Sequence, residues 1–202
     1  MISLTEMLKY LSKEIPKLNA LILIGGQSKR MGSDKSMLAY HGKPQWQHTV
    51  SLVEDVVNKV FVSVRAEQEV TYLNLLVDKV SGIGPFGAIL TALETYPNEA
   101  FLVLATDLPF IDKKTIELLI SKRDSTKFAT ALQGENKDYP EPLICIWEPK
   151  ALPKIQEYFQ KEIYKPIQVL KNIPTRIVQV SDQLVQNINT LEGFDKAKKD
   201  LG

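Results

Sequence analysis

A loop rich in glycine and cationic side chains follows the first apolar run of the chain. Gly25 and Gly26 come directly after that run, and Arg30 and Lys35 lie a few residues further on. Glycines let the backbone approach a phosphate closely and point successive N–H groups at it, while two cations suit a ligand with several negative charges. The loop is therefore predicted to bind a polyphosphate, although its residue types also allow a surface turn with solvated Lys and Arg side chains.

The loop matches neither of two well-known phosphate-binding motifs. A Walker A loop has Lys and then Ser or Thr after its last glycine, whereas Gly32 is followed by Ser33 and Asp34. The dinucleotide fingerprint Gly-x-Gly-x-x-Gly is also missing from this loop. The loop is therefore expected to bind phosphates in another way.

A literal Gly-x-Gly-x-x-Gly does occur later, at residues 82–87, and Asp107 follows at about the distance of a ribose-binding acid. This pattern is the best argument for a dehydrogenase. However, the preceding segment contains the charged residues Asp78 and Lys79, which are not typical of a buried central strand. Pro85 also removes a backbone N–H where the fingerprint would bind pyrophosphate. Dinucleotide binding stays an alternative.

Two aspartates follow apolar runs and are candidate ligand-binding residues. Asp107 comes after residues 101–105, with Thr106 between, and a carboxylate at a strand end suits Mg²⁺, which takes one or two carboxylates together with phosphate oxygens. The alternative role for Asp107 is to cap a following helix. Asp78 follows residues 75–77 and could equally be a solvated turn residue.

Asn187 and Asn189 would lie on one face of an extended segment, because strand side chains repeat every second residue. Both could therefore face a cleft, although Asn189 could instead cap the helix expected after it. His41, His48 and Cys145 have no spacing typical of a zinc site, and His48 is expected to be structural.

Short apolar runs alternate with amphipathic segments, which indicates βαβ units and a mostly parallel sheet with helices on both faces. The expected strands are residues 20–24, 60–64, 75–78, 101–105, 128–132, 143–147 and 176–180. The expected helices are residues 45–58, 86–96, 113–122, 149–160 and 191–200. The fold class is therefore α/β.

Two regions depart from this alternation. Within residues 128–147, two expected strands flank a polar turn, which predicts a small antiparallel excursion. Residues 4–14 have the apolar spacing of a short amphipathic helix that Pro16 ends. We therefore divide the chain into an N-terminal helical extension, 1–17, and one domain, 18–202.

Composition places the chain among soluble globular proteins. It has 202 residues, a net charge of +1, an apolar share of 44% and one cysteine, Cys145. One cysteine permits no intramolecular disulfide, and the balanced charge argues against a general nucleic-acid binder. The apolar runs are too short to span a bilayer, and residues 1–6 lack the basic start of a signal peptide. We expect a cytoplasmic protein with no membrane partner.

Residues 23–35 resemble the signature Leu-x-Gly-Gly-x-Ser-x-Arg-Met-Gly-x-Asp-Lys of molybdenum cofactor guanylyltransferases. The similarity extends over about 18–202 and includes further motifs in order, at residues 42–44, 46–48, 84–87, 106–110, 141–143 and 187–190. The resemblance implies a single-domain, Rossmann-like three-layer sandwich of the glycosyltransferase-A-like nucleotidyltransferase type. It also implies an activity: transfer of GMP from GTP to molybdenum-loaded molybdopterin, with release of pyrophosphate.

The resemblance also assigns roles to individual residues. Arg30, Lys35 and Asp107 would be catalytic, and Asp107 and Asn189 would hold Mg²⁺, the implied cofactor. The implied GTP-binding residues are Leu23, Ile24, Gly25, Gly26, Lys35, Asp78 and Asp107. Ser63 stands where the family tends to have asparagine, a departure at a nucleotide contact.

Other activities are compatible with these motifs. They include a cytidylyltransferase, a sugar-phosphate nucleotidyltransferase, and a nucleotide-binding chaperone for cofactor insertion that has lost turnover. The implied partners are GTP and molybdopterin as substrates, together with other proteins of molybdenum cofactor assembly.

Overall fold

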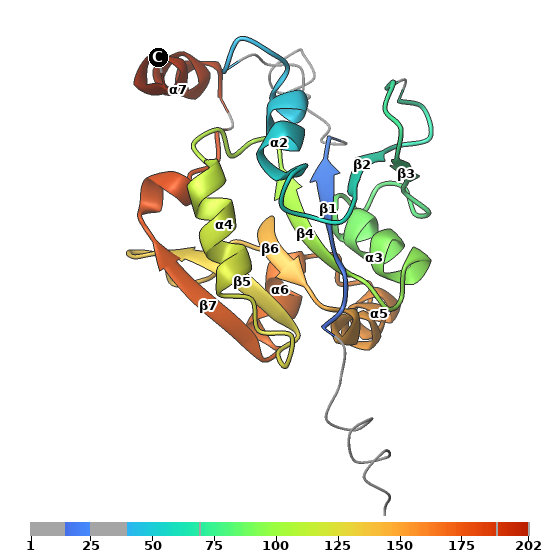
Figure 1. Ribbon diagram of the computed structural model, residues 1–202. Coiled ribbons are helices and arrows are strands. Elements are labelled where there is room, and N and C mark those ends of the chain that lie inside the picture. The colour runs from blue at the N-terminus through green and yellow to red at the C-terminus, as the bar shows by residue number, and fades with distance from the viewer. Residues whose placement is uncertain (1–14, 25–39, 69, 189, 202) are drawn as a thin grey trace, which may run out of the picture.

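The computed structural model describes residues 15–24, 40–68, 70–188 and 190–201. Its seven-stranded sheet has the order β3-β2-β1-β4-β6-β5-β7 (Figure 1). The strands are β1 (Leu18–Leu23), β2 (Val60–Val64), β3 (Leu75–Val77), β4 (Ala100–Ala105), β5 (Ala129–Gly134), β6 (Ile144–Trp147) and β7 (Thr175–Val180). The helices are α2 (Gln45–Val53), α3 (Pro85–Thr95), α4 (Lys113–Ser121), α5 (Leu152–Gln160), α6 (Pro166–Lys171) and α7 (Leu191–Leu201), with short 3₁₀ turns η2 (Pro149–Ala151) and η3 (Asp182–Val185).

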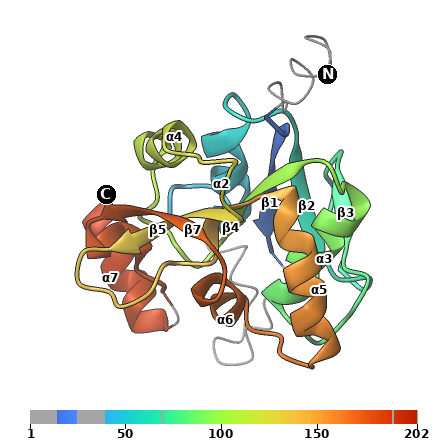
Figure 2. The same cartoon turned by 90° about the horizontal axis from the view of Figure 1, so that it is seen from below.

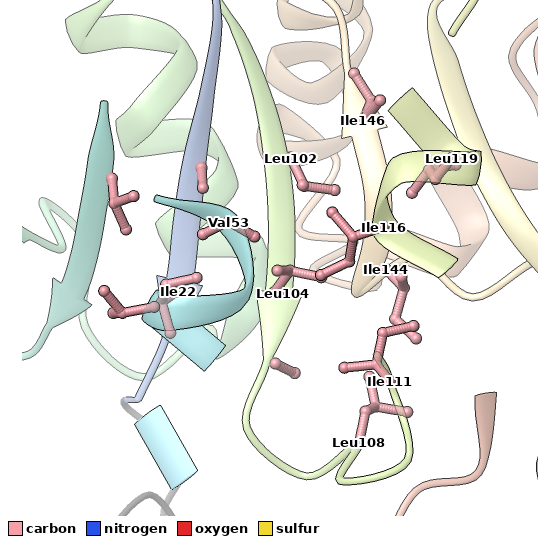
Figure 3. Close-up of a cluster of buried hydrophobic side chains, with 14 of the residues drawn as sticks. Ile22, Val53, Leu102, Leu104, Leu108, Ile111, Ile116, Leu119, Ile144 and Ile146 are labelled. Atoms are coloured by element: carbon pink, nitrogen blue, oxygen red, sulfur yellow. The ribbon is translucent and has the colours of Figure 1, made fainter. Parts of the chain in front are cut away.

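Helices cover both faces of the sheet, so the expected three-layer α/β sandwich is confirmed. Figure 2 shows α2 and α4 on one side and α5 and α6 on the other. The central strands β1, β2, β4 and β6 are buried along almost their whole length, as continuous apolar runs in covered sheets are. In Figure 3, Ile116 and Leu119 of α4 point toward Leu102, Ile144 and Ile146 of the sheet.

The antiparallel excursion is also confirmed, and it lies within the sheet. Strand β6 inserts between β4 and β5 and runs antiparallel to both, with Val103 opposite Cys145 and Cys145 opposite Ala131. Every other neighbouring pair of strands is parallel. Because β6 runs the opposite way, its amino end lies at the same edge of the sheet as the carboxyl ends of the other strands.

Several element boundaries differ from the expectations. Helix α2 ends at Val53 rather than at residue 58, and the chain then turns so that the Asn58 N–H donates to the Leu18 carbonyl (2.8 Å) on the way into β2. Helix α6 was not expected from the sequence, because its six residues are too few to display a helical period. The helix expected over 4–14 lies outside the described residues, so the division at 17 stays a prediction.

No helix among the described residues combines the length and apolar character needed to cross a membrane.

Candidate active site

A cavity of about 360 Å³ opens at the carboxyl ends of β1, β2 and β3. Three parallel strands end here, and ligands of open α/β sheets bind outside the carboxyl ends of their strands. The sheet contributes Leu23, Ser63, Arg65 and Asp78. The other lining residues come from the turn into α3: Val80, Ser81, Gly82, Gly84, Pro85 and Ala88. The strand ends therefore supply the charged groups of the cavity, and the turn into α3 supplies mostly small residues.

Asp78 is held in this cavity from two directions. The Ser63 hydroxyl donates to Asp78 Oδ1 (2.7 Å), and the Asp78 N–H donates to the Val64 carbonyl (3.0 Å). Burial raises the pKa of the Asp78 carboxyl, while the Ser63 hydrogen bond and the charge of Arg65 lower it. The structure therefore excludes the solvated-turn alternative for Asp78, and Ser63 acts at this site by orienting the carboxylate.

The glycines at 82–87 shape the wall of the cavity. Gly82 (φ +82°) and Gly84 (φ +59°) adopt left-handed backbone that disfavours side chains, and a Cβ on Gly87 would lie 2.9 Å from the Val80 carbonyl. The strand before them, β3, is at the edge of the sheet, and its Leu75 is exposed. A dinucleotide fingerprint follows the first strand at the centre of a doubly wound sheet, so the dehydrogenase alternative is wrong.

Asp107 follows β4 at the same edge of the sheet. The Thr106 hydroxyl donates to the Leu23 carbonyl at the end of β1 (3.4 Å), and the Ile188 N–H donates to the Asp107 carbonyl (2.8 Å). Helix α4 is capped by Asp112, whose Oδ1 accepts from the Thr115 N–H (2.8 Å). The capping alternative for Asp107 is therefore wrong.

Glu141 is a further candidate site residue, which sequence reasoning did not select. Burial and the charge of Asp107 raise the pKa of the Glu141 carboxyl. Hydrogen bonds from the Leu143 N–H (3.1 Å) and from the Asn187 side chain partly offset this rise. Glu141 precedes β6, and the reversed direction of that strand brings it to the edge where β4 ends. The only signal in the sequence was the motif at 141–143, whose place in space depended on this long-range pairing.

A second cavity, of about 240 Å³, lies beside Glu141. It is lined by Gly134, Lys137, Tyr139, Glu141, Val185, Gln186 and Asn187. The polar groups of this lining come from the turn after β5 and from the chain leading toward α7. Asn187 therefore lines a cavity, which agrees with the expectation that Asn187 and Asn189 could face a cleft together. Asn189 itself lies outside the described residues. At the start of α7 the capping contact comes from Thr190, whose hydroxyl accepts from the Gly193 N–H (3.1 Å).

Tyr40 connects Asp107 to the C-terminal helix. Its ring packs edge-on against Phe194 of α7 (4.7 Å between centroids), and Ile188 and Ala197 belong to the same buried cluster. Burial and the nearby charge of Asp107 raise the pKa of Tyr40 to about 12. The hydroxyl therefore stays protonated near neutral pH, and α7 is packed against the segment that carries Asp107.

His41 and His48 stack on each other with their ring centroids 3.6 Å apart. The His41 Nε2 lies 3.2 Å from the Pro109 carbonyl, next to the Asp107 segment. Burial, followed by the charges of His41 and Lys43, lowers the pKa of His48 to about 4. These contacts give His48 a packing environment in which its neutral form is favoured.

The His48 environment predicts a pH-dependent stability. Between pH 6.5 and 4 the unfolded chain binds a proton at His48 that the folded protein does not, so stability falls as pH drops through this window. Relative to His48→Gln, the wild type should lose about 1–2 kcal/mol of unfolding free energy between pH 7 and pH 4.5, a figure reduced for partial exposure. Chemical denaturation of both proteins at both pH values measures this difference, and parallel losses would contradict it.

Several expected site residues lie outside the described residues: Gly25, Gly26, Arg30, Lys35 and Asn189. Of those described, Leu23 lines the first cavity, and the Ile24 carbonyl accepts from the Gln68 side chain (3.3 Å). The structure therefore brings Leu23, Ile24, Asp78 and Asp107 to one edge of the sheet.

Comparison with known proteins agrees with this architecture. A molybdenum cofactor biosynthesis bifunctional protein of Synechocystis is 31% identical over 182 residues, covering 88% of this chain and 52% of that protein, so the chain spans about half its length. A probable molybdenum cofactor guanylyltransferase of Flavobacterium johnsoniae is 30% identical, covering 89% of this chain and 94% of that protein. The structure of molybdopterin-guanine dinucleotide biosynthesis protein A from Archaeoglobus fulgidus has the same fold, with a TM-score of 0.75 at 20% identity over 90% of this chain and 97% of that one.

The profile of the MobA-like NTP transferase domain matches residues 20–174, well over half of the sequence. The chain therefore belongs to the MobA-like NTP transferase family.

Proposed function

We propose that this protein transfers GMP from GTP to the terminal phosphate of molybdenum-loaded molybdopterin and forms molybdopterin guanine dinucleotide. A phosphate oxygen of the acceptor attacks the α-phosphorus, the bond between that phosphorus and its bridging oxygen to the β-phosphate breaks, and pyrophosphate leaves. The observation that carries the proposal is the placement of Asp78 and Asp107 at one edge of the sheet, with Asp78 lining a cavity there, in a chain of this family.

The first cavity is the proposed site for the guanine base. Guanine presents N1–H and N2–H₂ donors next to each other, and the half-buried Asp78 carboxylate is an acceptor that lines that cavity. The Ser63 hydroxyl donates a hydrogen bond to Asp78 Oδ1 and so holds the carboxylate in one orientation. A site built around such hydrogen bonds rejects a base that leaves its buried polar groups unpaired.

Mg²⁺ fits the donor set near Asp107. Asp107 and Glu141 supply carboxylate oxygens close enough to influence each other electrostatically, and Mg²⁺ is bound in proteins by one or two carboxylates together with substrate phosphates. Within the described residues no group of three or more His, Cys, Asp or Glu side chains forms a fuller metal site. Asp107 is the proposed ligand, and Mg²⁺ bound there would offset charge on the phosphates. Asn189 as a further ligand, and Arg30 and Lys35 as partners of the triphosphate, stay proposals from the resemblance.

The second cavity is the proposed site for the acceptor phosphate. It lies next to Glu141, and its lining includes the cation Lys137 and the hydrogen-bonding groups of Tyr139 and Asn187. The nucleophile is already an anion, so the reaction requires positioning and charge neutralisation rather than a general base. Contacts with other cofactor-assembly proteins and a cytoplasmic location are part of the proposal.

The deciding experiment is incubation of the protein with molybdopterin, Mg²⁺ and each nucleoside triphosphate in turn. We expect pyrophosphate release with GTP and a product of the mass of molybdopterin guanine dinucleotide. A preference for CTP would place the chain among cytidylyltransferases instead. GTP binding with no pyrophosphate release would support the non-catalytic chaperone alternative.

Asp78→Asn is expected to weaken GTP binding by about 100-fold, because the amide places a donor opposite the donors of guanine. The preference for GTP over ATP should shrink with it. Competition titrations with GTP and ATP in the presence of Mg²⁺ measure both effects, and thermal denaturation checks the fold. Asp55→Asn is the matched control, because the Asp55 side chain is exposed and pairs with Lys113 (3.2 Å) away from the cavity. Unchanged selectivity in Asp78→Asn would contradict the assignment of the base.

A further inference from the structure

Arg65 is the cation of the first cavity, and neither the resemblance nor the comparisons assign it a role. It follows β2 by one residue and lines the cavity together with Ser63 and Asp78. Its backbone N–H donates to the Gln68 side chain (2.8 Å), which in turn donates to the Ile24 carbonyl (3.3 Å) at the end of β1. These hydrogen bonds therefore link the turn that carries Arg65 to the end of β1.

The guanidinium is also oriented from its outer side. Arg65 Nε donates to Glu67 Oε1 (2.7 Å), and the Arg65 side chain is 24% exposed against 68% for Glu67. Burial raises the pKa of the Asp78 carboxyl, and the positive charge of Arg65 reaches that carboxyl and opposes the rise. A donor group and an acceptor group therefore face the same cavity from neighbouring strand ends.

We propose that Arg65 determines base specificity by donating hydrogen bonds to guanine O6 and N7 while Asp78 accepts from N1–H and N2–H₂. On guanine the O6 acceptor lies directly beside N1–H, so a guanidinium beside a carboxylate matches the order of groups on the base. Arginine contacting O6 and N7 together is a geometrically favoured way to recognise guanine. This inference rests on the proposed function, in which guanine occupies this cavity.

The same pair of side chains opposes the other bases. Adenine places an amino group where guanine has O6, so a donor would meet the Arg65 guanidinium, and its N1 acceptor would meet the Asp78 carboxylate. Cytosine lacks the second ring that carries N7. Discrimination would therefore come from two residues that act on adjacent atoms of the base.

The test compares GTP with 7-deaza-GTP, which lacks the N7 acceptor but keeps O6 and the Watson–Crick edge. We expect Arg65→Ala to weaken GTP binding by about 10- to 100-fold and ATP binding much less. Wild type should bind 7-deaza-GTP more weakly than GTP, whereas Arg65→Ala should bind the two nucleotides nearly equally. Lys79→Ala is the matched control, because it removes the same charge beside Asp78 from a side chain that pairs with Glu94 (3.4 Å) and does not line the cavity.

Three outcomes would overturn the inference. Equal weakening of GTP and ATP in Arg65→Ala would make the cation a phosphate contact. If Arg65→Ala still bound 7-deaza-GTP more weakly than GTP, to the same degree as the wild type, Arg65 would not contact N7. If Lys79→Ala weakened GTP binding as much as Arg65→Ala, the positive charge near the cavity would matter and not the position of Arg65. A wild type with no preference for GTP over ATP would instead contradict the proposed function, so the two failures are distinguishable.

Discussion

Replacing Asp107 with asparagine is expected to lower the rate of GMP transfer by at least about 100-fold while the fold is kept. The carboxylate is the proposed Mg²⁺ ligand at the end of β4, and the amide retains its size but not its charge. The backbone carbonyl of Asp107, which accepts from the Ile188 N–H, is unaffected by the change. Turnover measured across a Mg²⁺ titration, together with thermal denaturation, checks this expectation.

The matched control is Asp112→Asn, a few residues further along the chain. Asp112 caps α4, and asparagine caps a helix about as well as aspartate, so this variant should keep both activity and stability. Full activity with an ordinary Mg²⁺ dependence in Asp107→Asn would show that the carboxylate does not hold the metal.

The sheet and part of the site could be predicted because both depend on short stretches of sequence. The apolar runs at 20–24 and 101–105 become β1 and β4, since a run with no polar residues is stable only where both faces are covered. Asp107 follows β4 with Thr106 between, and Asp78 directly follows the short edge strand β3. Because the carboxyl ends of parallel strands meet at one edge, their placement there follows from the order of the chain.

The rest of the site depends on pairing between distant segments. Glu141 lies near Asp107 only because β6 inserts between β4 and β5 in the reverse direction. Residues 128–147 contain both β5 and β6, but nothing in them specifies that β4 is the second neighbour of β6. The packing of Tyr40 on Phe194 likewise joins two segments that are far apart in the sequence. Residue types in the sequence suggested chemistry, but not which of these groups would meet.

A buried ion pair lies at the opposite edge of the sheet. Glu148 follows β6 and is fully buried, and its two carboxylate oxygens accept from Arg123 Nε (2.6 Å) and Nη2 (2.8 Å). The same Nη2 donates to the Pro16 carbonyl just before β1 (2.9 Å). Glu148→Ala would leave a buried guanidinium without its carboxylate, so the free energy of unfolding should fall by about 3–5 kcal/mol. Chemical denaturation measures this loss.

Two further variants separate the buried pair from charge in general. Glu157→Ala removes an exposed carboxylate whose partners are Lys154 and Lys161 (both 2.6 Å), and exposed pairs contribute little, so its stability should stay close to that of the wild type. The double variant Arg123→Met with Glu148→Leu removes both charges and should recover much of the loss, since apolar residues can replace a buried ion pair. Base selectivity should be unchanged in all folded variants, because the pair lies away from both cavities. A Glu148→Ala protein as stable as Glu157→Ala would show that the bidentate contact does not stabilise the fold.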